Sequence, residues 1–260
     1  MDPGTMAGIG LALVAIFGSM VMEGGNPAAM ILPPAMLIVF GGTIGVAMAS
    51  GLMKDFTGAI AGLKDALMSK PHDSEEAVRT VVEFADKARR EGLLALEEAA
   101  KGVDDPFLKK GIELAVDGTD PEELREILEA EIRSKKALDK AHSKVFVDMG
   151  GYAPTLGIIG TVLGLVHMLE NLSDPSSMGP LISAAFIATL WGVMTANLIY
   201  LPISNKLKRL SAEEVHHKEL ILEGVLAIQA GANPRTVTEK LKSYLPPAQR
   251  EEIGEEQKSA

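Results

Sequence analysis

The chain has 260 residues, a mean hydropathy of +0.18, a net charge of −10 and no cysteine. The lack of cysteine excludes disulfides, thiolate metal sites and cysteine nucleophiles, and the acidic balance argues against a nucleic-acid-binding protein. The acidic residues lie outside the apolar runs, which indicates a soluble part attached to a membrane part.

The first two apolar runs cover residues 6–22 and 28–50, and the short turn EGGNP separates them. No basic segment precedes the first run, so we expect a retained membrane helix rather than a secretory signal, although the run is short for a span. Residues 1–51 are therefore predicted to form a first transmembrane hairpin.

Residues 52–149 have a helical pattern throughout. Asp73, Asp105 and Asp120 each stand where an N-cap would begin a helix, the last two immediately before a proline that suits the first turn. From Pro121 the apolar pattern continues without a breaker to Gly150. The third membrane helix is therefore expected to extend far beyond the membrane.

The second pair of apolar runs lies in residues 150–204. Two antiparallel helices of about twenty residues would cross a bilayer, joined by a loop without a basic residue. Thr161 lies nine residues before Glu170, and Thr189 lies nine residues after Pro180. Since each residue adds about 1.5 Å, both hydroxyls are predicted at the same depth, near the middle of the membrane.

The fourth helix is expected to continue past Pro202 to a C-terminal turn at Gly231. A short helix at residues 234–245 and a disordered tail at residues 246–260 complete the predicted segment 205–260.

All 25 basic residues lie outside the spans, 16 in residues 52–149 and 9 in residues 205–260. The positive-inside rule therefore places both termini in the cytoplasm. The predicted fold is an all-α polytopic membrane protein with four transmembrane helices, the third and fourth extended into a helical cytoplasmic module. Small residues at Gly41, Gly45 and Ala49, and at Gly160 and Gly164, favour close helix contacts.

No enzyme signature is present: the sequence has no P-loop, nucleophile elbow, H-E-x-x-H or dinucleotide fingerprint. His216 and His217 stand beside two glutamates, but adjacent histidines point to different sides of a helix, so we predict no metal site and no resident cofactor. The spans contain no Asp or Glu away from their ends. Hydroxyls can coordinate a hard cation but cannot balance its charge, so a membrane carboxylate is expected from another chain.

The sequence resembles the flagellar motor stator A-subunits, the MotA/PomA family. The resemblance rests on AFIATLWGVMTANLIYLP at residues 185–202, YAPTLGIIGTVLGLVHML at 152–169, GVLAIQAGANPR at 224–235 and RREGLLALEE at 89–98. The related ExbB/TolQ energy-transducing channels have three spans in another arrangement and fit this chain less well.

The resemblance implies a multi-pass protein of the bacterial inner membrane that conducts ions together with a single-span B-subunit of the MotB/PomB type. The B-subunit's membrane aspartate would carry the ion. Five A-subunits would form a ring around two B-subunits, and the ring would push a FliG-like rotor protein. The transported ion is expected to be sodium, with protons as the alternative.

Four residues of the spans match functional positions of the family. Thr161 and Thr189 match threonines of sodium-driven members and would line the ion pathway. The alternative is that both hydroxyls only bond carbonyls of their own helices. Pro154 and Pro202 match prolines at the cytoplasmic ends of the spans and would act as hinges, or else merely end the spans.

Four charged residues outside the spans, Arg89, Arg90, Glu97 and Glu98, match the family's rotor contacts. The glutamates are expected about two turns beyond the arginines on one helical segment, so opposite charges form separate patches that suit weak, repeated contacts. The alternative is an ordinary solvated surface.

Other polar residues of the spans receive structural interpretations. His167 is expected near the membrane interface, Tyr152 at the cytoplasmic interface, Trp191 in packing or lipid contact, and Asn197 in a bond to a neighbouring helix. Two further functional hypotheses stay open: a channel or transporter that conducts alone, and a membrane scaffold without an ion role.

Overall fold

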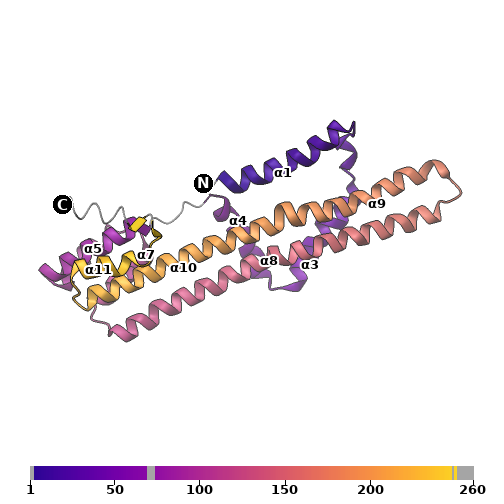
Figure 1. Ribbon diagram of the computed structural model, residues 1–260. Helices are drawn as coiled ribbons and strands as arrows, with labels where there is room; N and C mark the ends of the chain where they lie inside the picture. Colours follow the sequence, from indigo (N-terminus) through magenta and orange to yellow (C-terminus); the bar gives the residue numbers. More distant parts are fainter. Residues whose placement is uncertain (1–2, 69–73, 248, 251–260) are drawn as a thin grey trace. The chain divides into compact units, whose positions relative to one another are not determined.

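The computed structural model describes residues 3–68, 74–247 and 249–250, and every regular element in this part of the chain is a helix (Figure 1). The chain forms two compact units. One consists of Met1–Lys70 and Leu138–Leu210, and the other of Pro71–Ala137 and Ser211–Ala260. The predicted all-α class is confirmed, whereas the predicted boundaries of the membrane segments stay predictions.

The first unit begins with two apolar helical segments and a following helix. Its elements are α1 (Pro3–Met22), the 3₁₀ turn η1 (Pro27–Met30), α2 (Pro33–Met36), the π-helix η2 (Leu37–Gly41), α3 (Gly42–Ser50) and α4 (Met53–Met68). The second apolar run covers residues 28–50, but its α-helix begins only at Pro33. Pro33 and Pro34 have no N–H and favour a first turn, and Leu32 before them is extended.

Among the described residues, four helices are long and apolar enough to cross a membrane. They are Gly4–Met22, Pro33–Ser50, and apolar stretches within Pro121–Glu170 and within Pro175–Gln229. The four predicted transmembrane helices therefore all have counterparts in the structure, and the first is longer than the apolar run at residues 6–22 suggested.

The third and fourth spans belong to very long helices, as predicted. Helix α8 (Pro121–Glu170) has 50 residues, and α9 (Pro175–Thr195) continues through the π-helix η4 (Ala196–Tyr200) into α10 (Leu201–Gln229). Helix α9 begins five residues before the predicted Pro180, because the Asp174 side chain caps it by accepting a hydrogen bond from Ser176 N at 3.1 Å.

The second unit packs the remaining helices around one apolar core. These are α5 (Ser74–Glu91), η3 (Leu93–Ala95), α6 (Leu96–Ala100), α7 (Pro106–Val116) and α11 (Pro234–Lys242), together with the ends of α8 and α10. Fully buried leucines and isoleucines from several of these helices form the core: Leu96, Leu108, Ile112, Leu124, Leu128, Leu220, Ile221, Ile228 and Leu241.

The predicted helix ends of this unit are largely confirmed. The Asp105 carboxylate caps α7, the Asp120 carboxylate accepts from Glu122 N at 2.9 Å, and Gly231 has the positive φ of 67° expected after α10. The cap predicted at Asp73 lies outside the described residues. The tail prediction is wrong at its start, because the Arg250 guanidinium donates to the carbonyls of Leu245 and Ser243 at 2.7 and 3.1 Å.

Opposite charges connect α8 and α10 within the second unit. Arg125 pairs with Glu223 at 2.9 Å, Lys135 with Glu214 at 2.7 Å and Lys218 with Glu131 at 3.4 Å. Two of these carboxylates each bond a second basic residue: Lys110 of α7 bonds Glu131 and Lys240 of α11 bonds Glu223. These bonds lower the pKa of Glu131, and in Glu223 they outweigh the opposing effect of burial on the pKa.

Candidate functional site

Helices α8 and α9 run side by side as an antiparallel pair (Figure 1), and their backbones touch. A Cβ atom added to Gly192 would lie 2.5 Å from the carbonyl oxygen of Ala153 and 3.1 Å from Gly157 Cα. Only glycine at these positions allows such an approach. The contact continues along the pair, with Gly157 against Gly192, Gly160 against Ala188 and Gly164 against Ala185. The predicted role of Gly160 and Gly164 in helix packing is confirmed.

The other predicted stripe of small residues behaves differently. No atom lies within 4 Å of a Cβ built on Gly45, whereas Gly42 packs against the side chain of Leu156. Within one chain, the close contact to α8 is therefore made by Gly42 and not by Gly45.

The close approach of α8 and α9 brings the two predicted threonines together. The hydroxyls of Thr161 and Thr189 are within hydrogen-bond distance of each other. Thr161 Oγ1 also lies 2.9 Å from the carbonyl oxygen of Ala185 and 3.2 Å from that of Gly157, and Thr189 Oγ1 lies 3.3 Å from the same Gly157 oxygen. The predicted juxtaposition is thus present, although α9 starts earlier than predicted, because glycine packing rather than the helix ends sets the register.

This cluster contains more oxygen lone pairs than hydrogens to fill them. Two hydroxyl oxygens and the carbonyl oxygens of Gly157 and Ala185 meet, but each threonine hydroxyl has a single hydrogen to donate. The lone pairs left over are the kind of ligand that a hard cation prefers. The bond from Thr161 to Gly157, four residues earlier, is also the local helix bond that a purely structural role would make.

The surroundings of the threonine pair are apolar and largely uncovered in a single chain. Large apolar side chains of α8 and α9 are exposed around it: Ile158, Ile159, Val162, Leu163, Val166, Phe186, Leu190 and Val193. Such a surface needs lipid or other protein chains to cover it.

The predicted hinge prolines lie inside continuous helices. Pro154 removes the backbone donor that would bond the carbonyl of Gly150, and a Cβ on Gly150 would meet the side chain of Leu201, the residue before Pro202. The two prolines therefore flank one contact between α8 and α10, and the π-helix η4 ends just before Pro202. Their mechanical role stays a prediction.

The four charged residues predicted to contact the rotor are exposed, but they do not share one helix. Arg89 and Arg90 are in the last turn of α5, and Glu97 and Glu98 are in α6. The prediction of one continuous segment is wrong because Gly92, with a φ of 86°, turns the chain between the two helices.

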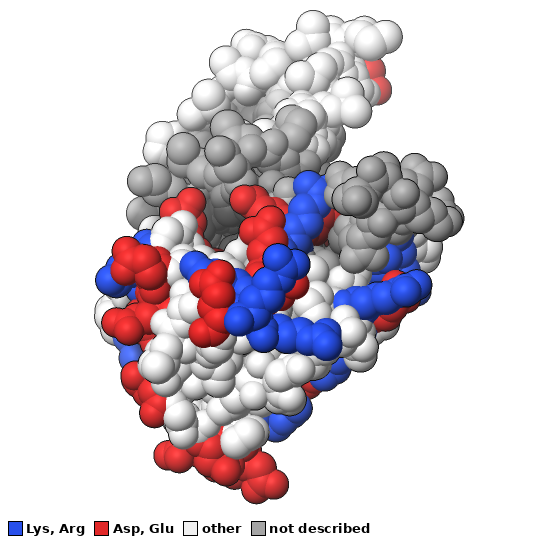
Figure 2. Space-filling model, turned by 90° about the vertical axis from the view of Figure 1, so that its left-hand side faces the viewer, with Lys and Arg blue, Asp and Glu red and all other residues white. Residues whose placement is uncertain are grey.

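Two of these charges already have partners within the chain. Arg90 pairs with Asp86 at 2.9 Å, and Glu98 pairs with Lys101 at 2.8 Å, which lowers the pKa of Glu98. Figure 2 shows acidic and basic side chains interspersed on one face of the molecule. Leu94, between the charged pairs, is 74% exposed and was not singled out from the sequence. The doubled leucine in RREGLLALEE is the signal that could have indicated an apolar residue at this surface.

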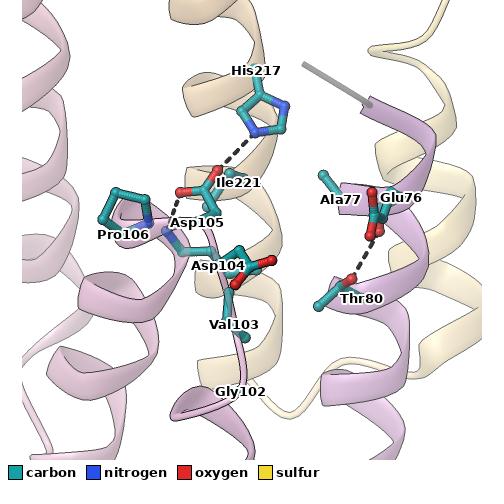
Figure 3. Close-up of a pocket in the computed structure, with 11 residues that line it drawn as sticks. Glu76, Ala77, Thr80, Gly102, Val103, Asp104, Asp105, Pro106, His217 and Ile221 are labelled. Carbon is teal, nitrogen blue, oxygen red and sulfur yellow. Dashed lines mark hydrogen bonds and ion pairs between the residues drawn. The ribbon is translucent and has the colours of Figure 1, made fainter. Parts of the chain in front are cut away.

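The adjacent histidines point to different partners, as predicted. His216 Nε2 lies 2.6 Å from the carbonyl oxygen of Tyr244, and the buried His217 Nε2 lies 2.9 Å from Asp105 Oδ2 (Figure 3). Burial tends to raise the pKa of Asp105, but bonds from His217 and from two backbone N–H groups outweigh it and lower the pKa. A pocket of about 420 Å³ adjoins this pair, and no group of metal-ligating side chains occurs among the described residues.

The remaining polar residues of the spans take structural positions. Trp191 is packed, with its indole N–H donating to the carbonyl of Met30. His167 is exposed near Glu170. The bond predicted from Asn197 to another helix is wrong, because its side-chain amide donates to the carbonyl of Val193 in its own helix at 2.8 Å.

Comparison with known proteins assigns the chain to a family. Residues 6–92 match the model of the motility protein A N-terminal region, and residues 99–220 match the model of the MotA/TolQ/ExbB proton channel family. Motility protein A of Bacillus subtilis (strain 168) is 39% identical over 98% of this chain and 95% of its own length. The chain belongs to the motility protein A family.

Other members of this family are about equally similar. Chemotaxis protein PomA of Vibrio alginolyticus is 38% identical over 94% of this chain and 96% of that protein. The structure of MotAB from C. jejuni superposes with a TM-score of 0.91 at 34% identity, covering 95% of this chain and 97% of that one. The flagellar MotAB stator complex of Bacillus subtilis gives a TM-score of 0.88 at 38% identity, covering 95% and 98%.

The glycine contact predicts opposite effects of two matched substitutions in the helix pair. Gly192→Ala in α9 forces a methyl group against the Ala153 carbonyl and should destabilise the purified protein by about 1–3 kcal/mol. Gly151→Ala in α8, where the new methyl group has open space around it, should stabilise the helix by roughly 0.5–1 kcal/mol. Thermal unfolding in detergent measures both, and equal melting temperatures for the two variants would refute the proposed close packing.

Because Asp105 also bonds His217, removing its side chain should destabilise the protein more than removing an ordinary N-cap does. Asp105→Ala should cost about 2–3 kcal/mol, while Asp120→Ala, which removes a cap without a histidine partner, should cost about 1 kcal/mol. Because the folded state lowers the pKa of Asp105, its contribution is present above the unfolded pKa of about 4 and is lost as pH falls below it. Thermal unfolding at pH 7 and at low pH checks both statements; no difference between the variants at pH 7 would contradict them.

Proposed function

We propose that this chain is the A-subunit of a flagellar stator and converts an ion gradient into torque on the rotor. In this role it would lie in the bacterial inner membrane with both termini in the cytoplasm. The similarity to chains in two MotAB structures, one of them described as a flagellar stator complex, supports the proposal. The match of residues 6–92 to the motility protein A model, together with four candidate spans, favours a stator over an ExbB/TolQ-like channel.

The observation that carries the proposal is the threonine pair in spans that have no carboxylate. Thr161 and Thr189 bring oxygens together inside an apolar helix pair, but no side chain of the spans can neutralise an ion there. A charged partner is therefore required. A single-span B-subunit of the MotB or PomB type, with an aspartate at this depth, would supply the charge.

Sodium is the ion that this arrangement suits best. A proton can bind directly to a partner's carboxylate, whereas sodium must replace lost hydration water with protein oxygens. The two hydroxyls and the carbonyls of Gly157 and Ala185 offer such oxygens in one place. The ion is the transported substrate, and no resident cofactor and no enzymatic reaction are proposed.

The uncovered apolar surfaces suit a ring of several copies around the partner. None of the apolar stretch of α1 is buried within the chain, and only 17% of the apolar stretch of α8 is buried. Further copies of this chain, which we propose form a ring of five, together with the B-subunits and lipid, would cover these faces. Pro154 and Pro202, on either side of the Gly150–Leu201 contact, would then transmit movement of the spans to the cytoplasmic helices.

The rotor contact is proposed to involve Arg89, Arg90, Glu97 and Glu98, with a FliG-like protein as the partner. Arg90 and Glu98 are paired within the chain, while Arg89 makes no ion pair with any residue in the described part of the chain. We therefore expect Arg89 to be the more available of the two arginines for a weak, electrostatically steered contact.

Removing the hydroxyls tests the ion pathway. Thr161→Val and Thr189→Val keep the size of the side chain, and each should reduce sodium-driven swimming about tenfold or more when the B-subunit is present. Thr161→Ser and Thr189→Ser keep the oxygen and should retain most of the speed. Normal swimming of both valine variants at unchanged protein levels would support the scaffold hypothesis instead. Wild-type speed that is unchanged when potassium replaces sodium at fixed pH would exclude sodium but not the motor.

Reversing one charge tests the rotor contact. Arg89→Glu should lower swimming speed at least about twofold, because a like charge would meet the rotor's acidic partner. Arg79→Glu changes the same helix α5 at an exposed position that is already paired with Glu75 and should have a smaller effect. Tethered-cell rotation measures both variants, and equal speeds would speak against Arg89 as a contact.

A further inference from the structure

The first transmembrane hairpin contains a break that leaves a backbone carbonyl without its helical donor. In a continuous helix the carbonyl of Met30 would bond to the N–H three or four residues later. Those residues are Pro33 and Pro34, and proline has no N–H. Leu32 N approaches the Met30 oxygen at 3.1 Å, a bond across only two residues that leaves the oxygen's second lone pair open.

Trp191 of α9, in the second hairpin, donates a second hydrogen bond to this carbonyl. Its indole Nε1–H donates to the Met30 oxygen at 2.8 Å, and Met30 is buried. The indole ring also packs against Phe40 with ring centroids 5.6 Å apart. The buried Met30 oxygen thus accepts two hydrogen bonds, one from Leu32 N and one from Trp191, and the second connects the two hairpins at one defined point.

The connection is made beside the threonine pair. Trp191 follows Thr189 by two residues, and the Trp191 carbonyl accepts the hydroxyl of Thr195 at 2.8 Å. Ala35, just after the proline pair, forms a buried cluster with Ile187 and Ala188. The turn of α9 that carries Thr189 is therefore held between α8 on one side and the broken segment of the first hairpin on the other.

We propose that Trp191 is a positioning residue for the ion pathway. Its bond to Met30 fixes the rotation and depth of α9, and through α9 it fixes the distance between Thr189 and Thr161. This inference rests on the proposed function. It gives the first hairpin a part in ion binding, although none of that hairpin's described residues contributes an oxygen to the threonine cluster.

Two substitutions separate the hydrogen bond from the ring packing. Trp191→Phe keeps an aromatic ring but removes the donor, and Phe40→Leu removes the ring partner but keeps the bond. In cells with the B-subunit, Trp191→Phe should raise the external sodium concentration for half-maximal swimming speed at least about threefold, the size of effect expected from one hydrogen bond. Maximal speed at saturating sodium should stay above roughly half of the wild-type value, since the proposed aspartate of the B-subunit is unchanged.

The half-maximal sodium concentration for Phe40→Leu should stay within about twofold of the wild-type value. A Trp191→Phe variant with the wild-type sodium requirement, or equal shifts in the two variants, would overturn the proposal. A wild-type chain that supports no ion-driven rotation would instead refute the proposed function, so the two failures are distinguishable.

A second variant covers the case in which Trp191→Phe accumulates poorly. Pro34→Ala supplies a backbone N–H four residues after Met30, so the first hairpin can rewind at Leu32 and bond the Met30 carbonyl itself, but this bond cannot hold α9. In the double variant Trp191→Phe with Pro34→Ala, the protein level should recover while the sodium requirement stays raised. If both return to the wild-type values, Trp191 serves folding alone and the proposal is wrong.

Discussion

The contact between the backbones of α8 and α9 positions the hydroxyls and carbonyls on which the proposed function depends. Gly157 and Gly192 bring the two helices so close that a methyl group at Gly192 would collide with a carbonyl. At this separation Thr161 reaches both its own helix and the carbonyl of Ala185. Larger residues at the contact would push the helices apart and move Thr161 away from the Ala185 carbonyl. The glycines therefore create the polar cluster, although they contribute no side-chain oxygen to it.

The second constraint is the absence of charge from the spans. The threonine cluster can replace part of an ion's hydration shell, but a cation in an apolar helix pair also needs a negative charge. The chain's own carboxylates lie outside the spans or at their ends, and several of those in the second unit are already paired with lysine or arginine. The spans therefore offer oxygens for an ion but no negative charge, which is the physical reason for expecting a partner chain.

The sequence predicted features that depend on local signals. The long α8 followed from the lack of a breaker after Pro121. The juxtaposition of Thr161 with Thr189 was predicted from the lengths of the two runs, although glycine packing and not the helix ends sets it. Features that depend on tertiary contacts were missed. Nothing local indicated that Trp191 would bond Met30, which is 161 residues earlier in the chain. The break at Gly92 was overlooked because the apolar periodicity continues across it, and only its positive φ reveals the turn.

The central claim is that this chain provides oxygens for the ion while another chain provides the acidic group. Sodium flux into liposomes, measured with the purified chain alone and with the chain reconstituted together with an activated B-subunit, tests this division most directly. We predict no gradient-driven, sodium-selective flux for the chain alone, and clear flux for the complex that disappears when the B-subunit's membrane aspartate is replaced by asparagine. Selective sodium flux through the chain alone would contradict the account.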